Sequence, residues 1–383
     1  MRVAGLRRFG VAMLAVGVIA GLAACGSSTK AANSSGTKDA AAAASAADLG
    51  GLDGLIAAAK KEGALNVIAL PPDWANYGEV VDAFAKKYGI KVNSDNPDGS
   101  SQDEINAVKS LKGQGRAPDV LDLGGAFAQS AAKESLLAPY QVATWADIPV
   151  AGKDAAGAWY FDYGGYVSIG CDAKKITVCP QTFADLLKPQ YKGKVALNGD
   201  PTKSGSAFAG VFAAALANGG TLDKIQPGID YFGKLKKSGN YIPVESTPAT
   251  IEKGETPISI DWDYLNAGYA EKLKAKGIDW KVAVPSDGLY ANYYCQAISK
   301  YAPHPAAARL WEEFLYSDEG QNLWLKGKAR PVRLAKMTTA GTATASYVDA
   351  LPKVSGEATF PTTAQTDAAK KVLVDQWSKA LTG

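Results

Sequence analysis

Two short segments of the chain combine acidic with aromatic side chains. Each follows an apolar run that predicts a strand, and together they contain Asp73, Trp74, Tyr77, Asp261, Trp262, Asp263 and Tyr264. A cationic amine needs carboxylates to balance its charge and aromatic faces beside its alkyl chain, and one well-placed ring contributes about 0.5–2 kcal/mol. These residue types predict a site for a small organic cation. The alternative is that the rings pack in a core and the aspartates cap helices.

A third segment, with the residues Ser204, Gly205 and Ser206, is typical of an anion-binding helix start. The residues that follow, 207–217, predict a helix. The free N–H groups at a helix N-terminus attract phosphate or carboxylate. Lys203 is the only base close by, and no arginine adjoins the loop, which weakens the phosphate interpretation. Because serine is also a common N-cap, a purely structural role is the competing interpretation.

The elements that must position these side chains alternate between strands and helices. Strands are predicted at 65–70, 90–92 and 118–123, with helices between them, so this part should form a doubly wound α/β lobe. Further strands are predicted at 195–197 and 257–261. In open α/β sheets, ligands bind in the crevice beyond the strand ends, where the acidic and aromatic segments stand.

Three other residues are candidates because of their place between these elements. Asp162 and Tyr163 lie on an extended crossover at 159–169 and are expected to line a hinge. Gly125, next to Gly124, ends a strand where the backbone could approach a ligand closely. The chain then continues through residues 282–298, which are mostly extended, to predicted helices at 305–315, 319–326 and 364–381.

Charge and composition exclude several classes of function. The 383 residues include 41 basic and 38 acidic side chains, and without residues 1–24, which contain three arginines, the two totals are both 38. Such a balanced surface argues against nucleic acid as a partner. His304 is the only histidine and there is no C-x-x-C pair. We therefore predict no catalytic residue, no metal site and no cofactor.

The N-terminus has the layout of a secretory signal. Arg2, Arg7 and Arg8 precede an uncharged run, and the run ends in Leu-Ala-Ala before Cys25. This resembles the lipobox of bacterial lipoproteins, which implies that Cys25 becomes the first mature residue and carries the lipid. Residues 26–47 are small and polar and predict a flexible tether. Export by the general or the twin-arginine route stays open.

Three further cysteines remain. Cys171 and Cys179 bracket a short polar loop, and outside the cytoplasm this spacing suits a local disulfide. Cys295 is expected to lie buried in a strand. Its pairing with Cys171 or Cys179 stays open, because connectivity does not follow from sequence.

Several passages resemble those of bacterial extracellular solute-binding proteins. Two of them are Thr182-Phe-Ala-Asp-Leu-Leu187 and Tyr191-Lys-Gly-Lys-Val-Ala-Leu197. A third runs from Pro305 through Trp311 to Leu315 and continues into Ser317-Asp-Glu-Gly-Gln321. The resemblance covers about residues 65–334 and implies a type II fold, with two doubly wound lobes joined by hinge strands that close on a ligand.

That resemblance implies an organisation and a set of partners. The expected parts are a signal peptide (1–24), a tether (25–47), the first part of lobe 1 (48–161), lobe 2 (162–290) and a return to lobe 1 (291–383). The expected function is the substrate-binding component of an ABC importer, which hands a small polar solute to a membrane permease without chemistry. The protein is expected to act as a monomer, lipid-anchored to the outer face of the cell membrane.

The chain resembles two subgroups of the family, and each suggests a different ligand. The loop around Asp73, Trp74 and Tyr77 resembles the N-W-x-x-Y loop of polyamine-binding proteins, with Asp73 in place of asparagine. The passage 200–206 resembles a segment of binding proteins for ferric ion, phosphonates and sugar phosphates. Tyr293 and Tyr294 resemble the tyrosine pair of ferric-binding proteins, although only one of two strand neighbours can face the crevice. Packing in the core is the favoured interpretation of this pair, although Tyr293 is kept among the candidate ligand contacts. A polyamine or related cation is the favoured ligand.

Two other classes of function are compatible with the sequence. The first is a lipoprotein enzyme on the same fold, since a fold does not fix a function; turnover would distinguish it. The second is an adhesion or structural lipoprotein, which would need no charged crevice and would not be stabilised by a small ligand.

Overall fold

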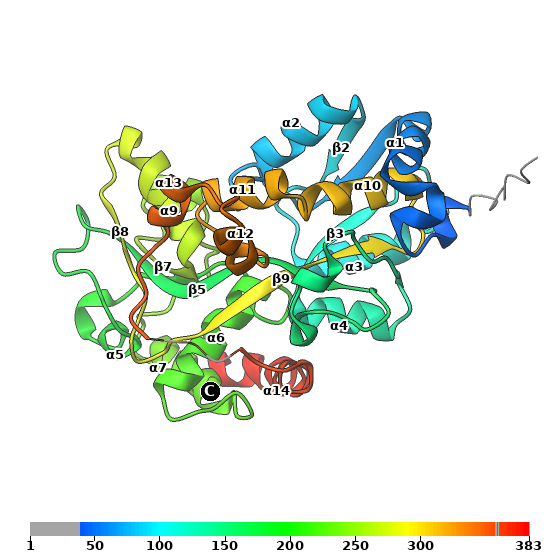
Figure 1. Ribbon diagram of the computed structural model, residues 1–383. Coiled ribbons are helices and arrows are strands. Elements are labelled where there is room, and N and C mark those ends of the chain that lie inside the picture. The colour runs from blue at the N-terminus through cyan, green and yellow to red at the C-terminus, as the bar shows by residue number, and fades with distance from the viewer. Residues whose placement is uncertain (1–38, 357, 359, 383) are drawn as a thin grey trace, which may run out of the picture. The chain divides into compact units, whose positions relative to one another are not determined.

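The computed structural model describes residues 39–356, 358 and 360–382 (Figure 1). The predicted signal peptide, the lipidation site Cys25 and the first part of the tether lie outside these residues. No helix in the described ranges is long and apolar enough to cross a membrane.

The folded chain begins earlier than the sequence predicts. Ala40–Ala42 and Ala46–Leu49 form short turns of 3-10 helix. The buried guanidinium of Arg309 donates hydrogen bonds of 2.8 and 2.9 Å to two backbone carbonyls of this segment. The prediction of a flexible tether is therefore wrong for residues 39–47, because a buried arginine needs these carbonyls as acceptors.

The strands form one small parallel sheet and one larger mixed sheet. Strand β1 (Ala64–Ile68) pairs with β2 (Lys91–Asp95) in the small sheet. The larger sheet has the order β3-β9-β5-β7-β6, in which only β6 and β7 run parallel. Its strands are β3 (Val120–Gly124), β4 (Leu137–Ala138), β5 (Tyr160–Asp172), β6 (Val195–Leu197), β7 (Ile258–Trp262), β8 (Trp280–Ala283), β9 (Ala291–Ser299) and β10 (Arg330–Pro331).

Strand β5 joins two lobes. Residues 160–166 pair with β9, whereas residues 167–172 pair with β7 and β8. We call the elements around β1–β4 and β9 lobe 1, and those around β6–β8 lobe 2. The pairing of β9 with β3 returns the chain to lobe 1. The predicted two-lobed α/β fold is thus confirmed, while its boundaries at residues 48, 162 and 291 stay predictions.

Helices cover both lobes. Lobe 1 carries α1 (Gly51–Glu62), α2 (Tyr77–Tyr88), α3 (Ser101–Ser110), α4 (Gly125–Lys133), α10 (Pro305–Leu315), α11 (Asp318–Lys326), α12 (Leu334–Ala340) and α13 (Ala345–Asp349). Lobe 2 carries α5 (Phe183–Leu186), α6 (Gly205–Ala217), α7 (Gln226–Lys237), α8 (Pro248–Lys253) and α9 (Asp263–Lys272). The last helix, α14 (Thr363–Thr382), lies beside α4 and α7 (Figure 1).

Sequence periodicity explains how these helices pack. In α2 the buried residues Tyr77, Val80, Phe84 and Tyr88 recur every three or four positions and face the core. Phe84 meets Trp311 of α10 edge to face, at 5.1 Å between ring centroids. Helix α6, rich in alanine and glycine, is buried along most of its length because sheet and helices surround it.

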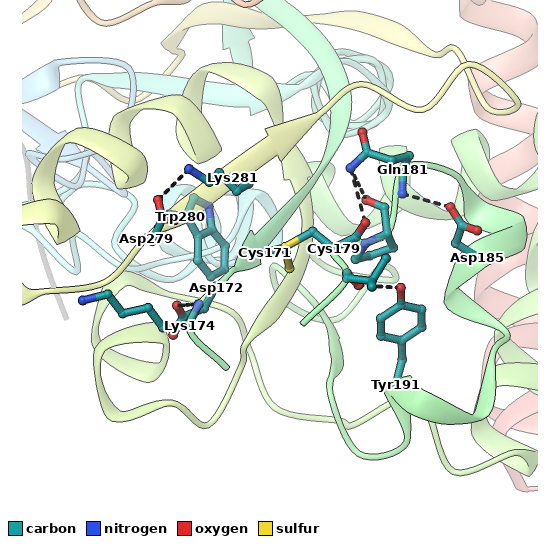
Figure 2. The surroundings of a disulfide bond; sticks show 12 residues. Cys171, Asp172, Lys174, Cys179, Gln181, Asp185, Tyr191, Asp279, Trp280 and Lys281 are labelled. Atoms are coloured by element: carbon teal, nitrogen blue, oxygen red, sulfur yellow. Dashed lines mark hydrogen bonds and ion pairs between the residues drawn. A yellow bond between two sulfur atoms is a disulfide. The ribbon is translucent and has the colours of Figure 1, made fainter. Parts of the chain in front are cut away.

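A disulfide joins Cys171, near the end of β5, to Cys179 in the loop that follows (Figure 2). The hydroxyl of Tyr191 donates to the carbonyl of Val178 at 2.8 Å and holds the same loop. Cys295 is a free, buried cysteine in β9. The alternative pairings of Cys295 are therefore wrong.

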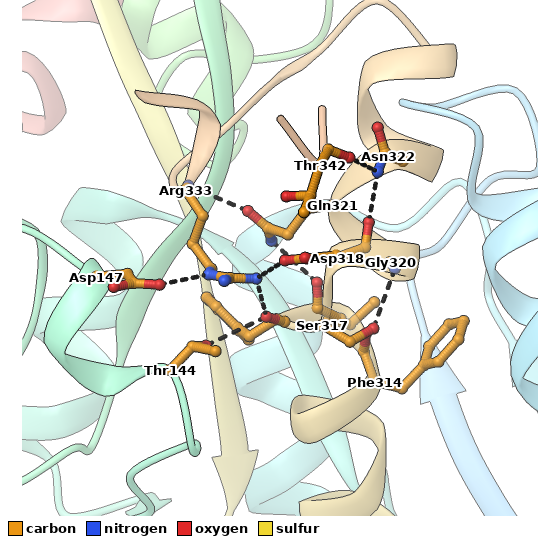
Figure 3. A network of polar contacts seen from close by, with 12 residues as sticks. Thr144, Asp147, Phe314, Ser317, Asp318, Gly320, Gln321, Asn322, Arg333 and Thr342 are labelled. Carbon is orange, nitrogen blue, oxygen red and sulfur yellow. Dashed lines mark hydrogen bonds and ion pairs between the residues drawn. The ribbon is translucent and has the colours of Figure 1, made fainter. Parts of the chain in front are cut away.

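Arg333 fastens the C-terminal part of lobe 1 (Figure 3). Its guanidinium donates to the carboxylates of Asp147 and Asp318, at 2.9 and 2.8 Å, and to the carbonyl of Tyr316. Its backbone N–H donates to Gln321. One buried cation thus joins α11, the segment before α12 and the loop at Asp147.

Asp119 holds three segments of lobe 1 together just before β3. Its carboxylate accepts hydrogen bonds from the backbone N–H groups of Asn66 and His304, at 2.6 and 2.7 Å. The ring Nδ1 of His304 lies 2.8 Å from the same carboxylate. The hydrogen bond and charge of Asp119, joined by the charge of Glu62, raise the pKa of His304 despite its partial burial. The protonated imidazole therefore strengthens the link between Asp119 and the segment that leads into α10.

We expect the replacement His304→Gln to destabilise the protein at acidic pH. Because the folded-state pKa of His304 lies above the unfolded value near 6.5, its contribution is fully present below pH 6.5 and disappears as the pH rises through the folded pKa. Urea unfolding of both proteins across this range measures the difference in the free energy of unfolding. A difference that stays constant or grows with pH would contradict this assignment.

Candidate functional site

A cavity of about 370 Å³ lies between the lobes, beyond the ends of β1, β3 and β6. Lobe 1 contributes the loop after β1, the start of α3 and Asp122. Lobe 2 contributes the loop before α6, the loop before α8 and Tyr269 of α9. The lining residues are Ala69, Pro71, Pro72, Asp73, Trp74, Asp98, Gly99, Ser100, Ser101, Asp103, Glu104, Asp122, Asn198, Gly199, Asp200, Lys203, Ser204, Gly205, Glu245, Ser246, Thr247, Pro248, Tyr269 and Tyr294.

The cavity is strongly acidic. Among the described residues that line it, seven carry carboxylates, only Lys203 carries a basic group and none is arginine. The carboxylates belong to Asp73, Asp98, Asp103, Glu104, Asp122, Asp200 and Glu245. Desolvation, together with the charges of Asp98 and Asp103, raises the pKa of Glu245, although that side chain remains partly exposed. An excess of like charge in a confined space favours a cationic guest.

Asp122 and Glu104 form the buried acidic floor of the cavity. Asp122, the middle residue of β3, is 5% exposed and accepts a hydrogen bond of 2.6 Å from the hydroxyl of Tyr163. Glu104, on α3, accepts the backbone N–H of Asp122 at 2.9 Å. Burial raises the pKa of Asp122 to about 7 and also raises that of Glu104. Both carboxyls thus ionise more readily when a cation arrives.

Aromatic rings form one wall. The indole Nε1 of Trp74 donates to the hydroxyl of Tyr163 at 2.7 Å. The ring of Trp74 meets Tyr294 edge to face, with 5.4 Å between centroids. Trp74 is therefore held in one orientation by a hydrogen bond and a ring contact, and it lines the cavity together with Tyr269 and Tyr294.

Two helices begin at the cavity. Ser100 caps α3 in a reciprocal box with Asp103. Ser204 caps α6: its hydroxyl accepts the N–H of Ala207 and donates to the carbonyl of Asn198 at 2.8 Å. Gly205 is the first residue of α6 and lines the cavity, whereas the later residues of that helix do not. These N-termini supply partial positive charge at the edge of an otherwise acidic space.

The lobes touch beside the cavity through their backbones. A methyl group placed on Gly124 of lobe 1 would lie 2.9 Å from the Cα of Gly205 of lobe 2. The N–H of Gln102 also donates across the gap to the carbonyl of Lys203 at 3.3 Å. Asp73 and Lys272 form an ion pair between the lobes. The structure therefore has its two lobes in contact around the cavity.

The structure brings only some of the predicted residues to this cavity. Asp73, Trp74, Ser204 and Gly205 line it. Tyr77, Asp162 and Tyr163 are fully buried in lobe 1. Gln296 links them to the floor, since its side-chain amide donates to Tyr77, to Asp122 and to Asp162.

The other predicted residues have different contacts. Asp261 accepts hydrogen bonds from Ser206 and Asn198 and is buried. Asp263 pairs with Arg330 at 2.6 Å. The rings of Trp262 and Tyr264 are buried and stack on each other at 6.2 Å. Gly125 begins α4 outside the cavity. The segment 261–264 thus supports the cavity rather than lining it.

The tyrosine pair divides as strand neighbours should. Tyr294 lines the cavity. Tyr293 stacks on Phe161 at 5.1 Å between centroids and lies beside Phe360 on the other side of the sheet. Across residues 39–356, 358 and 360–382, no group of three or more His, Cys, Asp or Glu is arranged to hold a metal ion.

Sequence reasoning missed Glu104, Asp122, Glu245 and Tyr269, and of the two neighbouring tyrosines it selected Tyr293, which does not line the cavity, instead of Tyr294. An aspartate inside an otherwise apolar strand, as in Asp-Val-Leu-Asp-Leu, was a usable signal for Asp122, because buried carboxylates are rare without a role. Glu104 looks like an ordinary first-turn acid of a helix. Glu245 lies in a loop with no pattern, so only the tertiary structure reveals it.

Comparison with known proteins gives one family. The sequence profile described as bacterial extracellular solute-binding protein matches residues 116–353, more than half of the chain. No sequence among the curated proteins matches the chain.

Solved structures share the fold. The periplasmic binding protein P5PA is 21% identical, with a TM-score of 0.67 over 83% of this chain and 99% of that one. AfuA from Actinobacillus pleuropneumoniae, with exogenous fructose-6-phosphate bound, is 20% identical, with a TM-score of 0.66 over 83% and 99%. A ferric binding protein from Campylobacter jejuni is 18% identical, with a TM-score of 0.62 over 82% and 99%. These identities indicate a common architecture only.

We expect the replacement Gly124→Ala to keep the lobes apart. Its methyl group would collide with the backbone of Gly205, and overpacking of this kind costs about 1–3 kcal/mol. Because Gly124 does not line the cavity, any loss of ligand affinity, roughly 5- to 150-fold, would come from impaired closure. Small-angle scattering should show a larger radius of gyration for Gly124→Ala than for the unmodified protein. The control is Gly268→Ala, where a methyl group meets open space; equal behaviour of the two variants would refute the closure contact.

Proposed function

The chain belongs to the bacterial extracellular solute-binding proteins, the solute-binding components of ABC importers, and we propose that its ligand is a small organic cation such as a polyamine. The observation that carries this proposal is the charge of the interlobe cavity, where seven carboxylates face one lysine. A cation entering this space relieves repulsion among the carboxylates, whereas an anion would increase it.

The cavity contains groups that would contact both the charged and the apolar parts of such a ligand. Asp122, Glu104 and Glu245 would balance the ammonium groups. Trp74, Tyr269 and Tyr294 would pack against the alkyl chain between them, since organic cations favour aromatic faces. Asp73 would add a further negative charge at the edge of the cavity, and its ion pair with Lys272 would weaken when it contacts the ligand.

No chemistry is needed for this function. Residues from both lobes line the cavity, so a ligand that binds both lobes favours their contact over their separation. We propose that the closed form docks on a membrane permease, that the protein acts as a monomer, and that lipid on Cys25 holds it at the outer face of the membrane. The sequence pattern around Cys25 supports this last step.

A second candidate is a ligand with a phosphate, phosphonate or carboxylate group, or a ferric complex. Its support is the start of α6, where Ser204 and Gly205 line the cavity beside Lys203. AfuA holds a sugar phosphate and the Campylobacter protein is named for ferric ion. The scarcity of basic side chains in the lining weighs against an exclusively anionic ligand.

We expect polyamines to stabilise the protein against heat. The experiment uses the chain without residues 1–25 and a panel of putrescine, spermidine, 2-aminoethylphosphonate, a hexose phosphate and ferric citrate. A ligand at 100 times its Kd adds about 2.7 kcal/mol to the free energy of unfolding, which shifts the melting temperature by several degrees.

Asp122→Asn keeps the shape of the side chain and should weaken cation binding by about 2 kcal/mol or more. Asp230→Asn, at an exposed aspartate of α7, is the matched control. A shift with the phosphorylated compounds alone would overturn the proposal.

Binding of a cation should strengthen with pH. Burial raises the pKa of Asp122 to about 7, so below that value a proton must leave before the carboxylate can balance an ammonium group. We expect the affinity to rise by up to about tenfold per pH unit below pH 7 and to level off above it. Isothermal titration calorimetry in buffers of different ionisation enthalpy measures the proton released. Asp122→Asn should show a flatter profile, and an unchanged profile in that variant would exclude Asp122 as the group responsible.

A further inference from the structure

The C-terminal helix α14 lies against both lobes. The family profile ends at residue 353, ten residues before α14 begins at Thr363. The helix runs along α7 of lobe 2 and beside α4 of lobe 1 (Figure 1). Near its start, Thr366 borders a small gap together with Gly124 of lobe 1 and Gly205 of lobe 2, the two glycines at which the lobes touch. Helix α14 therefore spans the junction that opens when the lobes separate.

The contact of α14 with lobe 2 is close and largely apolar, with one side-chain hydrogen bond from Gln365 to Asp223. Trp377 packs against Phe232 and Tyr241, at 5.4 and 6.3 Å between ring centroids. Ala369 and Leu373 are buried on the same face of α14. The backbones approach closely as well, because a methyl group on Gly233 of α7 would lie 2.9 Å from the carbonyl oxygen of Ala380. Separating these surfaces would expose large rings to water, so this contact is expected to persist.

The contact of α14 with lobe 1 includes charged groups. The ammonium of Lys370 lies 3.4 Å from the centroid of the Phe127 ring in α4. Asp367 forms an ion pair with Lys133 at the end of α4. Lys370 is partly desolvated here, and burial lowers its pKa to about 8. The ion pair of Asp367 with the exposed Lys133 is of the kind that contributes little to stability, which suits a contact that forms and breaks.

From this asymmetry we propose that α14 is a strap that stays on lobe 2 and fastens to α4 of lobe 1 when the lobes close. Lys370 and Asp367 are its fastening residues. The strap favours the closed arrangement before any ligand is present and thereby sets how much binding energy closure requires. This role is independent of the identity of the ligand.

Distances between spin labels in the ligand-free protein test the strap. One pair, at the exposed positions Lys86 of α2 and Lys236 of α7, reports the separation of the lobes. Exposed Ser378 of α14, paired with Lys236, reports whether α14 moves on lobe 2. The proposal expects a closed population in the unmodified chain, and Lys370→Met and Asp367→Asn should each reduce the closed-to-open ratio roughly two- to tenfold. The distance between Ser378 and Lys236 should stay single and unchanged throughout.

Matched variants distinguish the effect of the fastening residues from a general effect of charge on α14. Lys371→Met and Asp375→Asn remove the same charges from exposed positions of the same helix and should leave the ratio unchanged. Melting curves of all four variants check that the fold is intact. An entirely open unmodified protein, equal shifts at Lys370 and Lys371, or a distance between Ser378 and Lys236 that changes with opening would each overturn the proposal. None of these outcomes bears on which ligand binds.

Discussion

The cavity depends on one buried chain of hydrogen bonds in lobe 1. Trp74 donates to Tyr163, Tyr163 donates to Asp122, and Gln296 donates to the other oxygen of Asp122. These residues come from the loop after β1 and from strands β5, β3 and β9. The chain therefore fixes an aromatic wall and an acidic floor with the same bonds that tie the central strands together. Because Tyr163, Asp122 and Gln296 are buried, losing one of their bonds would leave a polar group without compensation.

Burial gives the acidic floor its chemical character. Asp122 and Asp162 share the amide of Gln296, and the described partners of this pair include no cation. Desolvation raises the pKa of both carboxyls, which favours protonation of the pair over two negative charges in a poor solvent. A cationic ligand offers the alternative compensation. The starts of α3 and α6 lie at the edge of the same space and would suit a ligand that also carries an acidic group.

Closure joins this site to the rest of the molecule. The lobes meet at Gly124 and Gly205, which leave room for backbone contact. Helix α14 crosses the same junction, and its residue Thr366 borders a small gap beside these glycines. The strand that connects the lobes, β5, runs through both sheet regions, and its pairing with β9 shifts register between Phe161 and Gly164. Helix α14 thus lies at the junction of the lobes, and none of its described residues lines the cavity.

The sequence alone determined the class of fold and the places where the chain turns from strand to helix. Apolar runs, glycines and caps are local signals, so the predicted helix at 305–315 coincides with α10, and the strand predicted at 257–261 differs from β7 by one residue. The local pairing of Cys171 with Cys179 was favoured for the same reason, since only a short polar loop separates them. Asp73, Trp74, Ser204 and Gly205 could be chosen because they stand at strand ends or helix starts.

Only the tertiary structure decided which side chains share the cavity. Asp261 and Asp263 have the right chemistry in the sequence, but Ser206, Asn198 and Arg330 occupy their oxygens in the fold. Glu245 and Tyr269 reach the cavity only because lobe 2 folds over lobe 1. The return of β9 beside β3 turns Tyr294 inward and Tyr293 outward, as the alternation of a strand requires. Periodicity reports the face of an element, whereas the partner that covers this face comes from distant parts of the chain.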